Sequence, residues 1–246
     1  MKILRTLLIL FLVIFVLPSA LSAAIWWVGD NPRSWREADW SSARVLPAAS
    51  ETPEPAVYVM AARTGGLKGA VAEHSWLVLK DAGASRYERW DVVGWGNPVR
   101  QNAYDADGRW YSNVPRIVAE VHGDEASALI PQLRKAIGEY RFSNRGDYTI
   151  FPGPNSNTFV ATVLRDVPSF RVMLPPAAVG RDFPVDGSLA SFDEDRSEFR
   201  ASLFGYAGLV VGPEAGLEIN LFGLVAGIDP LDLSVKIPAF GAYSLS

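Results

Sequence analysis

The chain has 246 residues, and 49% of them are apolar, which is enough to build a sizeable core and excludes global disorder. The formal net charge of −4 argues against a basic surface for nucleic acid, so no nucleic-acid partner is expected. The chain contains no cysteine, which excludes disulfide bonds, thiol catalysis, zinc–thiolate sites and iron–sulfur clusters.

The first segment has the pattern of an exported protein. Lys2 and Arg5 precede an apolar run over residues 7–17, and small residues follow it. This order predicts a signal peptide over residues 1–24 or, alternatively, a membrane anchor, because residues 6–28 are also long enough to span a bilayer. Both alternatives predict a protein of the cell envelope, either periplasmic or anchored in the inner membrane and facing the periplasm.

Residues 25–55 are predicted to be a tether rich in Trp and Pro. Trp35 and Trp40 are expected to rest on the membrane surface or to pack on the following domain. The second alternative is preferred, because tryptophan is usually buried.

An α+β domain is predicted over residues 56–185. Apolar runs and alternating patterns predict strands at 56–62, 70–80, 87–93, 117–121 and 148–151. Apolar residues at helical spacing predict helices at 124–140 and 157–166. The second and third strands are expected to pair as an antiparallel hairpin.

Residues 186–246 are predicted to form an acidic loop and a β-rich extension. Three apolar runs interrupted by glycine predict three antiparallel strands, at 203–211, 216–227 and 235–243. These strands could extend the first sheet, form a second sheet or contact a membrane as an apolar flap. The acidic residues 193–195 suit a solvated loop better than a cation site, so we expect no metal ion and no other cofactor.

The most informative motif is the heptapeptide Gly-Pro-Asn-Ser-Asn-Thr-Phe at residues 153–159, where a turn leads into a predicted helix. The start of a helix can direct a side chain and several backbone N–H groups at one ligand. Ser156 is therefore a candidate nucleophile, and His74, on a predicted strand, is its candidate general base.

An orienting carboxylate and three residues of the motif complete this catalytic hypothesis. Glu88 is the first choice for the group that orients the histidine, since it lies on the paired strand with the same parity as Trp90 and Val92. Asp91, of the opposite parity, is the second choice. Asn155, Asn157 and Thr158 are expected to line the cleft or to stabilise an oxyanion.

Each candidate also has a purely structural interpretation. Ser156, Asn155 or Asn157 can simply cap the helix, which is the commonest role of such residues before an apolar helical run. His74 can be a core histidine with a buried partner. Glu88 can be a solvated strand residue.

Four segments resemble the signature of an uncharacterised bacterial domain family, over roughly residues 35–182. They are Arg36-x-x-Asp39-Trp40-Ser41-Ser42, His74-Ser75-Trp76, Val93-Gly94-Trp95-Gly96 and the heptapeptide at 153–159. This resemblance implies little about activity.

A more distant resemblance is to circularly permuted papain-like enzymes, which include envelope peptidases and lecithin-retinol acyltransferases. In those enzymes a histidine on a strand precedes a cysteine at a helix start, within an Asn-Cys-x-x-Phe-Val pattern. His74 and the segment from Asn155 to Val160 match this order, with Ser156 in the place of the cysteine. The resemblance implies a permuted papain-like antiparallel sheet packed against helices.

Two functions follow from this sequence. The first is an exported hydrolase or acyltransferase that uses Ser156 and His74 on an amide or ester of envelope material. The second is a non-catalytic envelope module that has lost the cysteine and binds peptidoglycan, a peptide or a lipid in the old cleft. Serine depends on a base far more than cysteine does, which is the chemical reason for keeping the second alternative.

Overall fold

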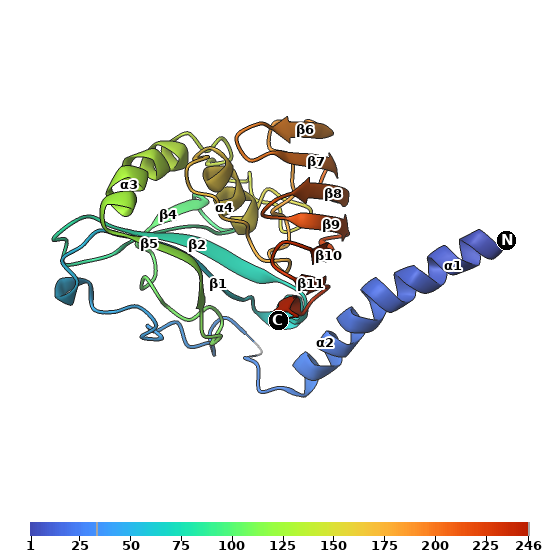
Figure 1. Cartoon of the computed structure of the whole chain (residues 1–246). Helices are drawn as coiled ribbons and strands as arrows, with labels where there is room; N and C mark the ends of the chain where they lie inside the picture. The colour runs from blue at the N-terminus through green and yellow to red at the C-terminus, as the bar shows by residue number, and fades with distance from the viewer. Residues whose placement is uncertain (33, 246) are drawn as a thin grey trace.

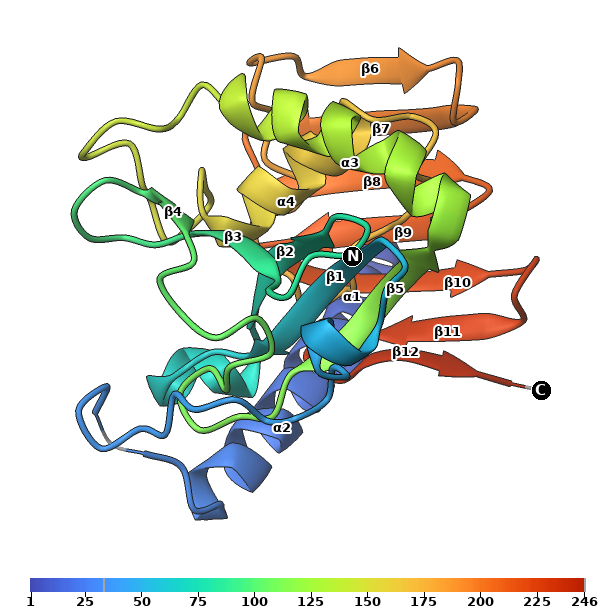
Figure 2. The same ribbon diagram turned by 90° about the vertical axis from the view of Figure 1, so that its left-hand side faces the viewer.

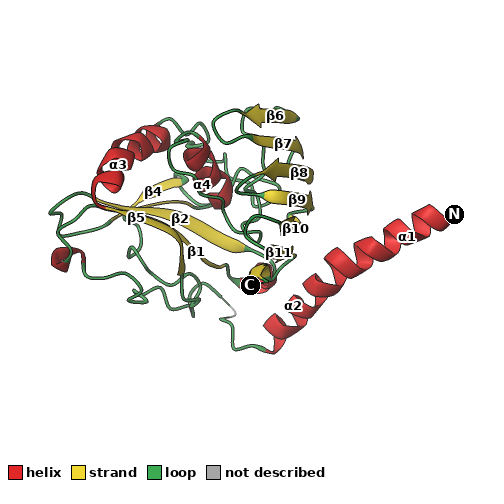
Figure 3. Ribbon diagram, in the orientation of Figure 1, coloured by secondary structure: helices red, strands yellow, loops and turns green. Residues whose placement is uncertain are grey.

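The computed structural model describes residues 1–32 and 34–245 and has an α+β fold, as the sequence predicts. An N-terminal helical segment leads through an extended strap into a five-stranded antiparallel sheet, two helices and a seven-stranded antiparallel sheet (Figure 1). The strands gather into these two separate sheets, with the helices packed near both (Figure 3).

The N-terminal helical segment contains α1 (Lys2–Phe11), a π-helical turn η1 (Leu12–Val16) and α2 (Leu17–Val28). Together they form a helix of 27 residues with a mean hydropathy of 2.7, long and apolar enough to cross a membrane. No residue of α1 is buried, whereas Phe15 of η1 is. Helix α1 therefore leaves the domain with its apolar surface uncovered.

The five-stranded sheet has the order β4-β3-β2-β1-β5. Its strands are β1 (Ala56–Arg63), β2 (Glu73–Lys80), β3 (Glu88–Val92), β4 (Val99–Gln101) and β5 (Arg116–His122). Both faces of β1 and β2 are buried, which explains the nearly continuous apolar sequence of β1 and the apolar run at residues 76–79 of β2.

Different parts of the chain cover the two faces of this sheet. Helices α3 (Gly123–Gly138) and α4 (Ser156–Arg165) pack on one face, against a core that includes Val57 and Leu77. On the other face, the ring of Trp40 from the strap meets the ring of Trp110 with their centroids 5.1 Å apart. The apolar side chains of β2 therefore point alternately into the two cores, Leu77 and Leu79 into the first and Trp76 and Val78 into the second.

The second sheet is a seven-stranded meander in which neighbours in sequence are neighbours in space. Its strands are β6 (Ala190–Asp193), β7 (Glu198–Leu203), β8 (Ala207–Gly212), β9 (Gly216–Leu221), β10 (Leu224–Asp229), β11 (Ser234–Ile237) and β12 (Gly241–Ser244). It stands behind α3 and α4 when the molecule is viewed from the side of the first sheet (Figure 2).

The expectation of three long C-terminal strands is wrong, because turns at residues 204–206, 222–223 and 238–240 interrupt the three apolar runs. Phe204 and Gly205 have φ values of 51° and 81°, and Phe222 and Gly223 have values of 54° and 80°. Two consecutive residues with positive φ are the requirement of a mirror-image two-residue turn, which matches the twist of the flanking strands.

The expected short strand at 148–151 is also absent from the described chain. These residues pair with no strand, and the N–H of Thr149 instead donates to the carbonyl oxygen of Pro154 at 2.8 Å. The segment therefore closes a loop onto the heptapeptide motif.

Candidate functional site

The start of α4 is built around Asn155, the N-cap residue. Its Oδ1 accepts hydrogen bonds from the N–H groups of Asn157 (2.9 Å) and Thr158 (3.1 Å). In return, Thr158 Oγ1 accepts from the Asn155 N–H at 3.1 Å, which completes a capping box. The capping interpretation is therefore confirmed for Asn155, and Ser156 is the first residue of the helix.

Side-chain amides attach this helix start to its surroundings. Asn155 Nδ2 donates to the carbonyl oxygens of Ile150 (2.9 Å) and Val179 (3.0 Å). Asn157 Nδ2 donates to the carbonyl oxygens of Val179 and Glu73, both at 2.8 Å. Because Glu73 directly precedes His74, the last bond joins the residue after Ser156 to the residue before the histidine.

His74 is the second residue of β2, and its side chain is buried. Its ring stacks on that of Trp110, with centroids 3.7 Å apart and planes at 6°. Its Nε2 lies 3.7 Å from Asp91 Oδ2, too far for a good hydrogen bond, and has no hydrogen-bond partner among the described residues. Because Nε2 faces Asp91, Nδ1 is the ring nitrogen left for a ligand.

Asp91 is buried and held in place by Arg89. Its Oδ2 accepts from Arg89 Nε (3.1 Å) and Nη2 (2.8 Å). The guanidinium also lies over the ring of Trp76, 4.1 Å from the centroid. The carboxylate is thus fixed beside the histidine by a buried cation.

Burial lowers the pKa of the His74 imidazole and outweighs Asp91, which acts in the opposite direction. Burial raises the pKa of Asp91, but its interaction with His74 and the charge of Arg89 outweigh that effect, so the pKa of this carboxyl is lowered. At neutral pH the pair is therefore a carboxylate beside a neutral imidazole, the form that can accept a proton.

The structure does not bring Glu88 to His74, and the preference for Glu88 over Asp91 is corrected here. Glu88 pairs with Leu79 on β2 and so points to the face covered by the helices. There its Oε2 accepts from Arg134 Nη2 of α3 at 2.7 Å, and Oε1 accepts from Trp90 Nε1. His74 points to the opposite face, where Asp91 lies.

Ser156 and His74 line one cavity of about 510 Å³, together with Asn155 and Asn157. The ring of His74 lies on the face of the sheet that the strap covers, whereas α4 packs on the other face. The start of α4 and the His74 ring therefore approach each other at the end of β2. Among the described residues, no hydrogen bond involves Ser156 Oγ. The two side chains share a cavity, and no hydrogen bond joins them in the described chain.

The expected oxyanion donors are already engaged. The N–H groups of Asn157 and Thr158 both donate to Asn155 Oδ1, and Thr158 is not among the residues that line the cavity. The N–H of Ser156, at the first helical position, has no intrahelical acceptor and is the donor that remains.

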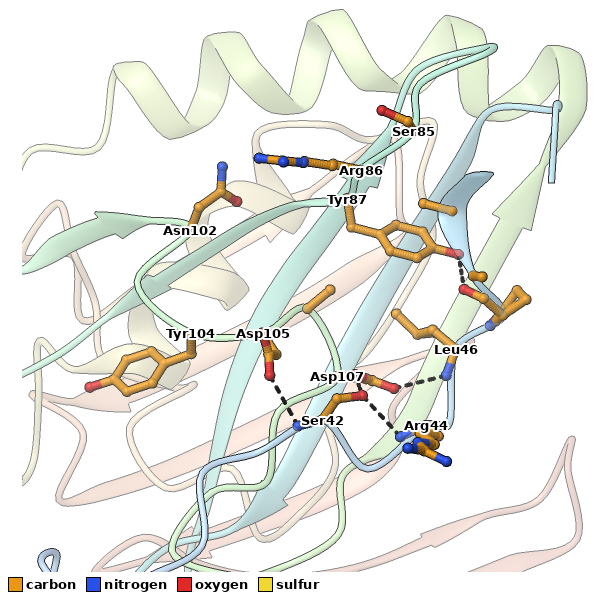
Figure 4. A pocket seen from close by; sticks show the side chains of 14 residues that line it. Ser42, Arg44, Leu46, Ser85, Arg86, Tyr87, Asn102, Tyr104, Asp105 and Asp107 are labelled. Atoms are coloured by element: carbon orange, nitrogen blue, oxygen red, sulfur yellow. Dashed lines mark hydrogen bonds between the residues drawn. The ribbon is translucent and has the colours of Figure 1, made fainter. Parts of the chain in front are cut away.

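A larger cavity of about 740 Å³ lies beneath the strap and carries no comparable chemistry (Figure 4). Its central carboxylate, Asp107, accepts from Ser42 Oγ (2.6 Å) and from the N–H of Val45 (2.8 Å). Tyr87 OH donates to the carbonyl oxygen of Pro47 at 3.1 Å. These groups hold the strap on the domain.

Metal chemistry has no support in the described part of the chain. Within residues 1–32 and 34–245, no three His, Asp or Glu side chains are grouped so that they could hold a metal ion.

The sequence comparison assigns the central domain to a family. Residues 54–183 match the model of DUF3750, described as a protein of unknown function. The chain belongs to this family. No curated protein and no solved structure matches the chain.

The DUF3750 region contains the five-stranded sheet, α3, α4 and the part of the following loop up to Phe183. All cavity-lining residues except Phe222 and Leu224 come from it. The second sheet thus lies outside the matched region but contributes two side chains to the cavity.

Proposed function

We propose that the chain is a membrane-anchored protein of the cell envelope, facing the periplasm, whose cavity carries out acyl transfer on an ester or amide of envelope material. The observation that carries this proposal is that a neutral, buried His74 has a fixed carboxylate at one ring nitrogen and shares a cavity with Ser156 at a helix start. This is the set of roles that a serine nucleophile needs.

In the proposed reaction, Ser156 Oγ attacks the substrate carbonyl carbon and its proton passes to His74 Nδ1. The carbonyl oxygen gains the electron pair and is stabilised by the Ser156 N–H at the positive end of α4. His74 then protonates the departing alcohol or amine, which leaves an acyl-Ser156 ester. Water completes hydrolysis, and a second alcohol or amine completes acyl transfer. Asp91 stabilises the imidazolium that forms.

The lining of the cavity indicates the kind of substrate. Much of the wall is aromatic or aliphatic, from Trp95, Tyr111, Tyr148, Phe222 and Leu224. Such a wall suits an acyl chain or another apolar group next to the scissile bond better than a bare glycan.

The position of α2 supports an anchor over a cleaved signal peptide. Ser22 is buried, and its Oγ donates to the carbonyl oxygen of Ala70. The indole of Trp26 lies so close to Gly69 that a Cβ there would meet it at 2.3 Å. The end of the predicted signal peptide, where cleavage would occur, is thus packed on the domain and is not an extended segment that a peptidase could reach.

A permuted papain-like relationship is part of the same proposal. It is supported by a strand histidine that precedes a nucleophile at the start of a helix packed on an antiparallel sheet. The hydrogen bond from Asn157 to Glu73, which links the two elements, is a feature of this arrangement that can be searched for in other such folds.

The second candidate is a non-catalytic binding module. It is favoured by the lack of a hydrogen bond between Ser156 Oγ and His74 in the described chain, and by the engagement of the Asn157 and Thr158 N–H groups in the cap. In that case the same cavity would hold a lipid, a peptide or a peptidoglycan fragment without reacting with it.

The deciding experiment is covalent labelling of the full chain, in detergent, with a fluorescent fluorophosphonate. Under the catalytic proposal the wild-type chain is labelled, whereas Ser156→Ala and His74→Ala are not. Ser75→Ala is the matched control, because Ser75 neighbours His74 but is buried away from the cavity with no hydrogen-bond partner for its Oγ.

Two further variants separate the orienting residue from its rejected alternative. Asp91→Asn should slow labelling by about 10²–10⁴-fold, the usual range for loss of acid–base assistance. Glu88→Gln should leave the rate unchanged. An unlabelled wild-type chain, or equal labelling of Ser156→Ala, would leave the binding module as the better candidate.

A further inference from the structure

The outer face of the second sheet is apolar from edge to edge. In an antiparallel sheet, directly paired residues lie on the same face. The pairing joins one residue from each of the seven strands into a single row: Phe192, Phe199, Val211, Leu217, Ile228, Val235 and Tyr243. Six of these side chains are exposed and the seventh, Val235, is half-buried.

The neighbouring rows on this face have the same character. Leu209, Ile219 and Ala226 form part of a second row, and Leu203, Leu221 and Leu224 part of a third. Ile219 is 44% exposed and Leu203 is 57% exposed. We call this surface, formed by the three rows, the apolar outer face.

The charged side chains of these strands point the other way. Glu218, Lys236 and Glu198 are buried on the inner face, against the DUF3750 region. Glu218 there forms ion pairs with Arg181 and Lys236. A sheet of a soluble protein normally buries its apolar face and exposes its polar face, so this arrangement is the reverse of the usual one.

The N-terminal helix indicates what covers the apolar outer face. Phe15 is buried where η1 packs against β10, so the helix meets the sheet itself. From there α1 projects on the side that the outer face looks toward, away from α3 and α4 (Figure 1). In Figure 2, which is turned by 90° so that the left-hand side of Figure 1 faces the viewer, α1 lies behind the first sheet, as the second sheet does.

The length of the helix beyond this contact is too short to cross a bilayer alone. From Lys2 to Ile14 the helix rises roughly 20 Å, at about 1.5 Å per residue, whereas the hydrocarbon core is about 30 Å thick. A helix that spans the bilayer while Phe15 contacts β10 therefore requires the sheet to enter the interface.

We propose that the apolar outer face is a membrane-docking surface that lies on the lipid bilayer crossed by the N-terminal helix. The sheet sinks into the headgroup and upper acyl region, as an interfacial amphipathic element does, and burial of apolar surface drives docking. The proposal rests on the helix being retained as an anchor, but not on any chemistry at Ser156.

Docking also places the cavity at the membrane. Leu224, in the third row of the apolar outer face, lines the cavity that contains Ser156 and His74, as does Phe222 in the preceding turn. A substrate or ligand with an acyl chain could then enter from the bilayer along these two side chains.

The absence of cysteine allows a direct test in the full chain. Ile219→Cys, on the apolar outer face, and Ser127→Cys, exposed on α3, each receive a nitrobenzoxadiazole label after reconstitution into phosphatidylcholine vesicles. Quenching by a lipid that carries a nitroxide on its acyl chain should be severalfold stronger at residue 219 than at residue 127. Because docking is apolar, the difference should persist in high salt and without anionic lipid.

Adding Val211→Glu to the Ile219→Cys chain should abolish the excess quenching, because a charge on the docking face must be desolvated. Retention of the chain on vesicles in alkaline carbonate tests the anchor separately, so failure of the anchor and failure of docking are distinguishable. Equal lipid quenching at 219 and 127 in an anchored chain would overturn the proposal. A second result would also overturn it: neither the lipid nitroxide nor aqueous iodide quenches the label at residue 219, and energy transfer occurs between labelled chains. That combination would mean that a second copy of the chain covers the face.

Discussion

At the scale of single residues, the environment of His74 favours a neutral ring. It stacks face to face on Trp110 and is almost completely removed from water. Among the described residues, Asp91 is the carboxylate that forms an ion pair with His74, and Arg89 is also paired with that carboxylate. Protonation of His74 would therefore add a second cation to a buried site, which costs free energy.

This environment predicts a pH-dependent stability. Since the pKa of His74 is lower in the folded chain than the usual value of about 6.5, the unfolded chain binds the proton more readily. The free energy of unfolding should therefore be constant above about pH 7 and fall as the pH drops below about 6.5. Asp91, whose pKa is also lowered, adds a second loss that begins below about pH 4.

Urea denaturation of the chain in detergent, at pH values from about 4.5 to about 8 on either side of the usual histidine pKa, measures this effect. His74→Gln should remove the decrease that begins near pH 6.5. His122→Gln is the matched control, because it replaces the other histidine, whose ring is exposed. A decrease of the same size in His74→Gln would contradict the assignment.

The choice between Glu88 and Asp91 shows what the sequence could not specify at this scale. Both residues lie on β3, and both carry a carboxylate within reach of β2. Alternate residues of a strand point to opposite faces of the sheet, so only one of the two carboxylates can lie on the same face as His74. Which one does so depends on the pairing register of β2 and β3. The sequence supplied the strand and the candidates, but not the face.

At the scale of elements, the start of α4 is held by more bonds than a helix cap requires. Asn155 alone makes two bonds to N–H groups and two to carbonyl oxygens. Gly180 makes room for it, since a Cβ at that position would lie 2.2 Å from Asn155 Nδ2 and the φ of 96° disfavours other residues. Asn155 therefore fixes both the helix and the cavity wall.

Asn155→Ala should destabilise the chain by roughly 2–4 kcal/mol, because it removes a cap and leaves buried carbonyl groups unpaired. Asn144→Ala is the matched control, since Asn144 is exposed and its side chain bonds only to the neighbouring Asp147. Urea denaturation of the two variants measures the difference. Similar losses in both would contradict the central role of Asn155.

The elements that the sequence predicted correctly are those whose apolar pattern is long and regular. The strands β1, β2, β3 and β5 and the helices α3 and α4 lie where periodicity places them. Two hairpins of the second sheet, β7–β8 and β9–β10, were missed because their turns carry Phe-Gly in place of the usual Asn-Gly or Asp-Gly. Phenylalanine in a left-handed conformation gives no turn signal in a sequence.

At the scale of the whole molecule, the second sheet is attached to the rest of the chain by charges. Alternation along β9 separates Leu217 and Ile219 from Glu218 and Asn220, but it does not say which set is covered. The usual expectation is that the apolar set is covered, and the structure has the opposite. The sequence therefore predicted strands here, but neither their partner nor the direction in which they face.

Glu218 is the central residue of this attachment. It is 1% exposed, and it pairs with Arg181 from the loop after α4 and with Lys236 from β11. Lys236 Nζ also donates to the carbonyl oxygen of Ala215 at 2.7 Å. Removing the carboxylate charge leaves two buried cations facing each other across an amide, which is far more costly than loss of an exposed ion pair.

Glu218→Gln should therefore lower the free energy of unfolding by about 3–5 kcal/mol. Glu214→Gln is the matched control, because Glu214 pairs with the exposed Arg171 at 3.1 Å and its loss should cost no more than about 1 kcal/mol. Urea denaturation measures both variants, and limited proteolysis shows where each chain opens. Cleavage of Glu218→Gln between the DUF3750 region and β6, before the first sheet unfolds, is expected if the ion pairs hold the second sheet in place. Equal stability of the two variants would mean that the apolar contacts of this sheet, and not its buried charges, attach it to the domain.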